Sequence, residues 1–436
     1  MLKLLRQLTF VIVIIHLFLL LAESSYFGDL FAFLGHTGLM ITHVVILTLI
    51  SLTAACFQLR KQLSNKPYLS LSVTWALYTL WVVFCSLHSV HTTDRLCELI
   101  LTPLTIVALF LCAPLILERQ HYRLILLSFS VLLGLHTLCI AWIMFKNNPE
   151  FFGRQVITVG GRPKFLGPIQ LPQTDGIFRS PNAIGSFLAL FPAFLLSEFL
   201  SAKNNQRYRT MLIATAVLIG AGLFLSYCRA AQASVLIGFL LPAIVFLKNT
   251  QARFLVCAAI LVTTAIVCLP DQHQWMFMNS SMAEHNIGPE AVRNSTAFVA
   301  HTVSSRRTEI WMGFLKHWQE HPWTGYGLLG VDYQNLGPHN FFLANLAYFG
   351  IPGLVLIVTL LCLAIKQIAG RAINQPRILI PLLGGLASLI LVHGSLEYSI
   401  SYPEYFTNSV FWLLLGYASI TQFEDRILKD DDVPKG

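Results

Sequence analysis

About twelve apolar segments, each close to the length of a membrane-spanning helix, dominate this 436-residue chain. A helix rises 1.5 Å per residue, so roughly 20 apolar residues cross the hydrocarbon core of a bilayer. Only 11% of the residues are charged, whereas a soluble protein carries about 25%. The apolar segments lie near residues 7–22, 37–56, 69–90, 98–117, 124–145, 181–201, 210–227, 231–247, 254–269, 341–365, 378–394 and 405–421. The sequence therefore predicts an all-α polytopic membrane protein with about 12 transmembrane helices.

The distribution of basic residues predicts the orientation of these helices. With the N-terminus in the cytoplasm, the inside loops hold most of the 29 lysines and arginines, and the outside loops hold more acids than bases. This is the asymmetry of the positive-inside rule, and it places both termini in the cytoplasm. The net charge of +8 then indicates topology, and we expect no nucleic-acid partner. The basic start before residues 7–22 resembles a signal peptide, but the many later apolar segments favour an uncleaved first span.

Two outside loops are long, at about residues 146–180 and 270–338. The second loop contains a predicted amphipathic helix at residues 305–320, and such a helix is expected to lie along the bilayer surface. Its apolar face consists of Ile310, Trp311, Phe314, Leu315 and Trp318. Trp311 is able to stack on a sugar ring, although packing is the commoner role for an interfacial tryptophan.

Four arginines fall on the outer side, against the charge bias of the rest of the chain. They are Arg179, Arg229, Arg306 and Arg307. A charge at the edge of the hydrocarbon is costly and tends to mark a site. Arginine donates hydrogen bonds in pairs and stays charged, which suits phosphate groups. The group predicts an anionic ligand, with diphosphate the natural candidate in a membrane, while Arg229 taken alone is equally well explained as a snorkelling side chain.

His339 lies between Pro338 and Asn340, at the point where an apolar segment re-enters the membrane. The proline stiffens the approach, and Asn340 is able to cap the following helix. A neutral imidazole here is able to accept a proton from a hydroxyl group. Glu397 lies in a late outside turn, where it is able to pair with an outer arginine, to orient His339, or simply to face solvent.

Metal and nucleotide sites are not indicated by the sequence. His317 and His321 have helical spacing, but no acid lies between them as in a zinc-binding HExxH motif. Gly325-Tyr-Gly327 is a lone turn, and Asp430-Asp431-Asp432 lies on a polar tail. We therefore expect no metal and no cofactor.

Five short motifs together resemble the O-antigen ligase superfamily, also called Wzy_C. They are Arg307-x-x-x-Trp311, His321-Pro322, Gly325-Tyr-Gly327, Pro338-His339-Asn340 and Gly350-Ile-Pro-Gly353. With Arg179 and Arg229, the resemblance covers about residues 176–400. The superfamily includes lipopolysaccharide O-antigen ligases, O-antigen polymerases and protein O-oligosaccharyltransferases, and the segment from His393 to Glu397 and Tyr398 resembles a late motif of the last group.

The resemblance implies a membrane glycosyltransferase of the GT-C type in the bacterial inner membrane, with a periplasmic active site. It implies three regions: helices and a first periplasmic loop at 1–175, a catalytic region at 176–400 that includes the loop 270–338, and a last helix with a cytoplasmic tail at 401–436. The implied donor is a glycan on undecaprenyl diphosphate, and the acceptor is the sugar core of lipid A, another glycan or a pilin.

We assign catalytic roles to His339, Arg229 and Arg179 in a metal-independent, inverting transfer. The substrate-binding residues expected are Arg307, Arg306, Asn340, Glu397, Tyr398 and Trp311. Ligation of O-antigen to lipid A-core is the first interpretation, with polymerase and pilin-modifying activities as alternatives. A transporter of lipid-linked glycans is the alternative outside enzymes, although the middles of the spans carry few of the polar groups a transporter uses.

Overall fold

The structure is a computed structural model that describes most of the chain. The described residues are 2–23, 35–57, 66–87, 93–145, 150–151, 154–155, 164–166, 169–171, 181–202, 205–226, 228–268, 307–327, 337–397 and 405–420. Among the predicted site residues, Arg179, Arg306 and Tyr398 lie outside these ranges, as do most of the loop 270–338 and the acidic tail.

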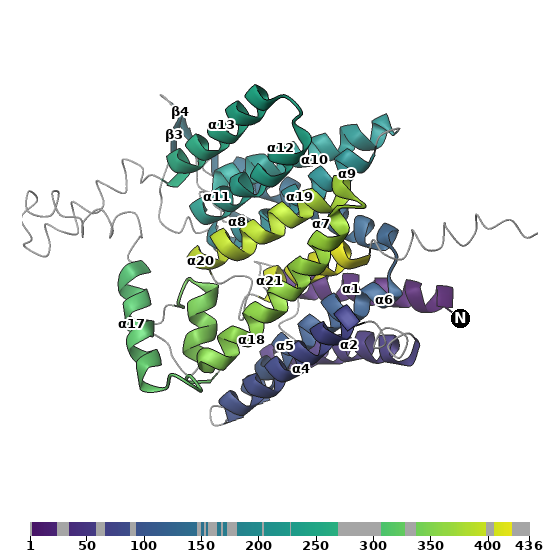
Figure 1. Cartoon of the computed structure of the whole chain (residues 1–436), viewed down its shortest axis with the longest axis vertical. Helices are drawn as coiled ribbons and strands as arrows, with labels where there is room; N and C mark the ends of the chain where they lie inside the picture. Colours follow the sequence, from purple (N-terminus) through teal and green to yellow (C-terminus); the bar gives the residue numbers. More distant parts are fainter. Residues whose placement is uncertain are drawn as a thin grey trace, which may run out of the picture.

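The described part of the chain is almost entirely helical (Figure 1). The helices before the second long loop are α1 (Leu2–Glu23), α2 (Gly35–Phe57), α4 (Lys66–Ser86), α5 (Thr93–Thr105), the π-helical η3 (Ile106–Cys112), α6 (Ala113–Ile116), α7 (Arg119–Phe145), α8 (Pro181–Leu188), α9 (Phe191–Ser201), α10 (Gln206–Ser226), α11 (Arg229–Gly238), α12 (Leu240–Phe246) and α13 (Thr250–Cys268). The later helices are α17 (Arg307–Glu320), α18 (Phe341–Ala372), α19 (Pro376–Ser388), the π-helical η4 (Leu389–His393), α20 (Gly394–Leu396) and α21 (Tyr405–Ile420).

Four short strands form two antiparallel hairpins within the first long loop. They are β1 (Glu150–Phe151) with β2 (Arg154–Gln155), and β3 (Lys164–Leu166) with β4 (Ile169–Leu171).

Ten helical segments in the described ranges are long and apolar enough to span a bilayer, against about 12 predicted. The two predicted spans that fall short are α13, whose apolar part is Thr250–Thr264, and the 16-residue α21. Helix α21 is a central helix, with every residue from Thr407 to Ala418 buried by its neighbours.

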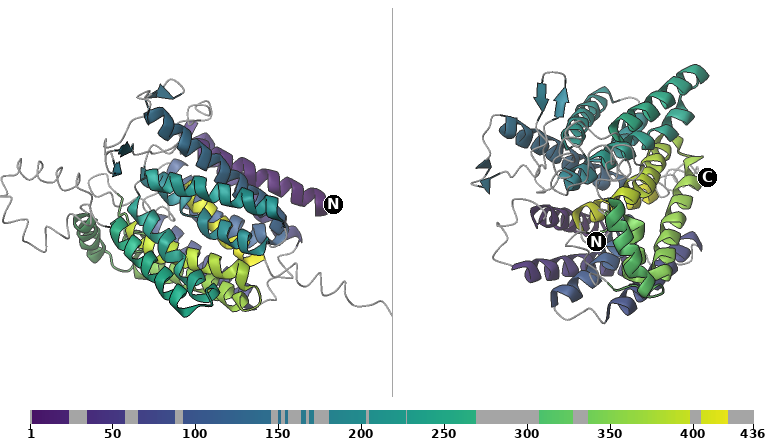
Figure 2. Two further views of the ribbon diagram at one scale, coloured as in Figure 1. Left: turned by 90° about the horizontal axis from the view of Figure 1, so that it is seen from above. Right: turned by 90° about the vertical axis from the view of Figure 1, so that its left-hand side faces the viewer.

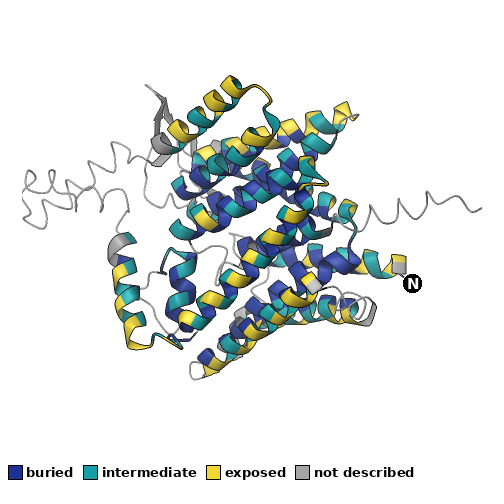
Figure 3. Cartoon of the chain, in the orientation of Figure 1, coloured by how far each residue is buried: buried dark blue, intermediate teal, exposed yellow. Residues whose placement is uncertain are grey.

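The outward faces of the long helices are apolar, as expected of a multi-pass membrane protein. On α1, the side chains of Leu8, Val11, Ile15 and Phe18 are about half exposed and recur at helical spacing along one stripe. Figure 3 shows similar exposed stripes on the outer helices around a buried centre. Such a surface suits lipid, because a monomeric soluble protein rarely exposes contiguous apolar patches of this kind.

A buried ionic cluster joins four helices at the end of the bundle opposite α17. The carboxylate of Glu198 on α9 is fully buried and pairs with Arg119 at 3.0 Å and with Arg123, both at the start of α7. Tyr208 on α10 and Tyr417 on α21 also donate hydrogen bonds to this carboxylate. The cluster satisfies a charge that would otherwise be very costly inside an apolar bundle.

Helix α17 and the first part of α18 lie side by side across one end of the bundle, transverse to the long helices (Figures 1 and 2). The backbone breaks at Gly350, where φ is 66° and ψ is −169°, so the helix changes direction there. The apolar helix predicted to begin at residue 341 does begin at Phe341, and it contains this break. The helix predicted at residues 305–320 is confirmed over Arg307–Glu320, with Ile310 and Phe314 buried against the bundle.

Candidate active site

His339 is held in an unusual backbone conformation directly before α18. Its φ is 44°, and it is the one non-glycine residue with a positive φ in the described part of the chain. Histidine is among the residues that tolerate this region best, yet the conformation persists only where its surroundings impose it. The following residue provides such a restraint, because the Asn340 side-chain carbonyl accepts a hydrogen bond from Leu343 N at 2.9 Å and caps the helix.

The amide of Asn340 also joins this helix start to the segment that carries Glu397. Its Nδ2 donates to the carbonyl of Ser395 at 3.0 Å, and the Glu397 N–H donates to the carbonyl of His393 at 2.7 Å. The side chain of Asn340 thus fixes two chain segments relative to each other, 55 residues apart in sequence. This is the contact that brings the acid of one segment to the imidazole of the other.

Glu397 bridges His339 and Arg307. Its Oε2 lies 3.0 Å from His339 Nδ1, and its Oε1 accepts a hydrogen bond from Arg307 Nη2. The Glu397 side chain is 5% exposed, compared with 26% for His339 and 19% for Arg307. Of the alternatives for Glu397, the structure thus contradicts a solvated loop acid, and both the arginine pairing and the contact with His339 occur together.

The charge state of Glu397 determines how His339 is protonated. Burial raises the pKa of this carboxyl, but the hydrogen bond from His339 and the charge of Arg307 together lower it more, so the pKa lies below its ordinary value. An ionised carboxylate only accepts hydrogen bonds, so His339 Nδ1 carries the proton that it shares with Glu397. In a neutral imidazole the lone pair is then on Nε2, the nitrogen able to accept a proton.

Helix α17 is attached to the same structure from the other side. Trp311 Nε1 donates to the carbonyl of Pro338 at 2.9 Å, directly before His339. Beyond the helix, the N–H groups of Tyr326 and Gly327 donate to the carbonyls of Ala347 and Tyr348 at 3.0 and 2.8 Å. The helix that carries Arg307 is therefore bonded to the residue before His339, and the turn after this helix is bonded to α18.

Helix α4 braces the first part of α18 through two side chains that the sequence did not indicate. The buried Tyr78 hydroxyl donates to Asn345 Oδ1 at 3.1 Å, and Trp81 Nε1 donates to the carbonyl of Phe349 at 2.8 Å. The second bond satisfies a carbonyl at the break in α18, which would otherwise lack a helical partner. In the sequence, a tyrosine and a tryptophan within an apolar segment are indistinguishable from ordinary core residues. Only their positions in the structure show that they support the first part of α18.

Arg229 opens α11 at the same end of the bundle. The Ser388 hydroxyl donates to the carbonyl of Ser234 at 2.5 Å, which sets the register between α11 and the antiparallel α19–η4 pair. Arg229 and His393 each lie five residues from this bond toward the α17 end. Arg229 thus comes level with the start of α20, which precedes Glu397.

The middle of α8 packs closely against Cys228, which directly precedes Arg229. A Cβ atom on Gly185 would lie 2.3 Å from the Cβ of Cys228, so a larger residue has no room there. Arg179 precedes this helix by two residues but lies outside the described ranges. The structure thus brings His339, Glu397, Arg307, Trp311 and Asn340 together, and it places Arg229 at the same end of the bundle.

Residues 214–358 of the chain match the family model described as O-antigen ligase. A search of curated proteins found no match for the chain. The family match includes Arg229, Arg307 and His339, and it confirms the resemblance inferred from the short motifs. The chain is accordingly similar to membrane enzymes of the O-antigen ligase, polymerase and oligosaccharyltransferase type, which are glycosyltransferase-like.

Proposed function

We propose that the protein transfers a glycan from undecaprenyl diphosphate to an acceptor hydroxyl group on the periplasmic side of the inner membrane. The acceptor we favour is the sugar core of lipid A. The observation that carries the proposal is the hydrogen-bonded series Arg307–Glu397–His339 beside the start of a membrane helix. It supplies an oriented base at a membrane surface, which a hydroxyl acceptor needs.

In this mechanism the acceptor oxygen attacks the anomeric carbon of the donor glycan. The new carbon–oxygen bond forms as the bond to the diphosphate breaks, so the configuration at that carbon inverts. The hydroxyl proton passes to His339 Nε2, while Glu397 holds Nδ1 and stabilises the resulting imidazolium. The lipid diphosphate leaves with the electron pair of the broken bond.

The arginines stabilise the departing diphosphate. Arg229 and Arg179 bind its oxygens and offset the negative charge that develops as the bond breaks. Arg307 donates a hydrogen bond to Glu397 in the structure. We therefore assign it two roles in donor binding: it holds α17 and His339 in position, and it contacts the donor directly. Arg306, Tyr398 and Trp311 complete the substrate-binding set that we propose, with Asn340 holding the two segments in place.

The test is transfer by purified protein in detergent, with an undecaprenyl diphosphate-linked glycan and three separate acceptors: lipid A-core, a second lipid-linked glycan and a pilin. We expect His339→Gln to lower the transfer rate by about 10²- to 10⁴-fold while donor binding is retained. We expect Arg229→Lys to lower transfer by about 10²- to 10³-fold, because lysine does not donate in pairs to a diphosphate.

Transfer in detergent also separates an enzyme from a flippase, because detergent provides no second compartment. No transfer to any acceptor, together with glycan movement across vesicles, would support the transporter instead. Transfer to the lipid-linked glycan or to pilin alone would retain the chemistry and change the acceptor. A His339→Gln protein with the wild-type rate would remove His339 from the mechanism.

A further inference from the structure

Trp323 exposes a large aromatic side chain in the turn that follows α17. The residue is 66% exposed, whereas tryptophan is on average highly buried. The other exposed residues between 313 and 324 are all polar: Lys316, Gln319, Glu320 and His321. A helix face that inserts into a bilayer is apolar around its tryptophan. The surface around Trp323 is therefore suited to water and not to lipid.

The backbone of this turn is fixed to the break in α18. The carbonyl of Pro322 accepts hydrogen bonds from Ile351 N at 3.0 Å and from Trp318 Nε1 at 3.2 Å. A Cβ atom on Gly350 would lie 2.1 Å from the carbonyl oxygen of Trp323, so the turn packs directly on the break. Because the backbone is held in place, a ligand that covers the indole has only the side chain to immobilise.

Two polar rings and a tyrosine lie beside the exposed indole in the same turn and at the end of α17. The ring of Tyr326 meets the rings of His321 and His317 edge to face, with centroids 4.7 and 5.9 Å apart. A sugar ring combines hydroxyl groups with apolar C–H faces. An exposed indole next to imidazole and phenol groups is complementary to both features.

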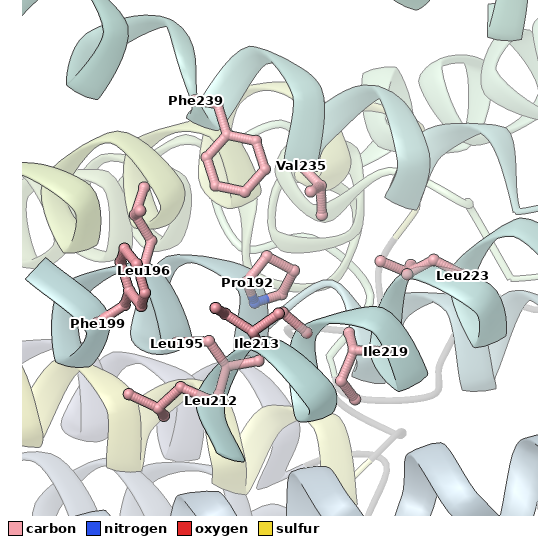
Figure 4. A pocket seen from close by; sticks show the side chains of 12 residues that line it. Pro192, Leu195, Leu196, Phe199, Leu212, Ile213, Ile219, Leu223, Val235 and Phe239 are labelled. Carbon is pink, nitrogen blue, oxygen red and sulfur yellow. The ribbon is translucent and has the colours of Figure 1, made fainter. Parts of the chain in front are cut away.

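The apolar groove between α9, α10 and α11 has the opposite chemistry (Figure 4). All of its lining residues are apolar, among them Leu195, Ile213 and Phe239. A sugar there would lose hydrogen bonds to water without replacing them, and each buried hydroxyl group would cost free energy. The turn after α17 is therefore the better sugar-binding surface of the two.

This turn and Arg229 lie on different sides of the candidate active site. Helix α17 begins at Arg307, which binds Glu397, and extends about 20 Å from there. The break on which the turn packs is bonded to α4, through Trp81 Nε1 and the carbonyl of Phe349. Figure 1 shows α4 in the lower half of the molecule and α11, which Arg229 opens, in the upper half.

We propose that Trp323, His321 and Tyr326 bind the sugar chain of the acceptor while its reacting hydroxyl group reaches His339. The assignment rests on the proposed function, in which Arg229 binds the diphosphate. In an inverting displacement the acceptor enters on the side opposite the leaving group. The side away from Arg229 is the α4 side, where the turn lies. Acceptor affinity consequently depends on sugars beyond the one that reacts.

The experiment measures binding to the full-length protein in detergent. The probes are the core oligosaccharide released from lipid A, followed by ligand-observed NMR, and lipid A without core and undecaprenyl diphosphate, followed by native mass spectrometry. We expect Trp323→Ala to raise the Kd for the core oligosaccharide about tenfold, which corresponds to roughly 50 Å² of apolar surface left uncovered. The Kd values for the two lipids are expected to stay within about twofold, since neither contacts the indole.

Two further variants serve as controls. Trp323→Phe keeps a flat ring, so the Kd for the core oligosaccharide should stay within about threefold of the wild type. Met312→Ala is the matched control, because Met312 is 64% exposed on α17 and its truncation removes apolar surface outside the turn. It should bind the core oligosaccharide as the wild type does. In transfer to lipid A-core, Trp323→Ala should raise the acceptor KM about tenfold with kcat within about twofold, since the reacting groups are unchanged.

Three results would overturn the proposal. They are wild-type protein that does not bind the core oligosaccharide, an unchanged Kd in Trp323→Ala, and an equal loss for lipid A without core, which would make Trp323 a membrane anchor. The turn is tested independently of transfer. Weaker core binding in Trp323→Ala, without transfer to any acceptor, would support the sugar-binding turn and reject the glycosyltransferase. Transfer with unchanged core binding and acceptor KM in Trp323→Ala would do the reverse.

Discussion

Glu397 is the residue that connects the others in the candidate site, because its two oxygens bind different partners. His339 Nδ1 lies at one oxygen and Arg307 at the other. Removing the negative charge changes both contacts at once. It also removes the reason for the proton to be on Nδ1, since a glutamine is able to donate a hydrogen bond to that nitrogen and place the proton on Nε2.

We therefore expect Glu397→Gln to lower the transfer rate by about 10²- to 10⁴-fold at neutral pH, through the wrong tautomer of His339. A pH dependence of stability accompanies this loss. The pKa of Glu397 is lowered in the folded protein, so its stabilising contribution is present above the ordinary carboxyl value of 4.5 and is lost as pH falls through the folded-state value.

The measurements are the transfer rate at neutral pH and the melting temperature from neutral to acid pH. The wild type should lose more melting temperature on acidification than Glu397→Gln does. Glu320→Gln is the matched control, because Glu320 is an exposed acid on the same α17 end. A Glu397→Gln protein with the wild-type rate and the same acid slope would show that the carboxylate does not act on His339.

At the scale of elements, the break at Gly350 determines where His339 lies. The φ of 66° and ψ of −169° belong to a region that only glycine adopts readily. A Cβ atom at this position would lie 2.1 Å from the carbonyl oxygen of Trp323, in the turn after α17. The first part of α18 and α17 therefore depend on this glycine for their packing.

We expect Gly350→Ala to destabilise the protein by at least about 1–3 kcal/mol and to reduce transfer. Gly370→Ala is the control on the same helix, because a Cβ atom there meets nothing within 4 Å and alanine favours a helix. Thermal melting in detergent and the transfer rate are the readouts. Equal melting temperatures for the two variants would show that the break tolerates a side chain.

At the scale of the whole molecule, the prediction concerns which end of the helix bundle faces the periplasm. The site and α17 lie at one end of the bundle, and the Glu198 cluster lies at the other. We expect the α17 end to face the periplasm, because the loops of the opposite end carry the excess of basic residues. Lys316 on α17 and Gln206 at the start of α10 are exposed positions at these two ends.

Single cysteines at these positions, in a background without the native cysteines, test the orientation. A membrane-impermeant maleimide should label Lys316→Cys in spheroplasts at least about tenfold faster than Gln206→Cys, since a charged reagent crosses the hydrocarbon core poorly. Permeabilisation should make the two rates similar. Labelling of Gln206→Cys in intact spheroplasts, with Lys316→Cys protected, would reverse the topology and place the site in the cytoplasm.

Much of the fold follows from local sequence properties. Hydrophobic segments of about 20 residues predict spanning helices because hydrocarbon thickness and helix rise are both fixed lengths. The amphipathic pattern of residues 305–320 predicts a helix from local sequence alone, and α17 confirms the helix. The predicted apolar helix does begin at residue 341, but the break at Gly350 was not predicted, because hydropathy does not report the direction of a helix.

The residue types of the candidate site could be predicted from the sequence, but the contacts between these residues could not. His339 is 58 residues from Glu397, and Arg307 is 90 residues from it. Their contacts depend on Asn340, which reaches the segment before Glu397, and on Tyr78 and Trp81, which belong to a distant helix. The sequence by itself thus determined the helices and the chemical types of the outer residues, since these depend on neighbours along the chain. Only the tertiary structure decided which acid orients which base, because that depends on how helices far apart in sequence pack against one another.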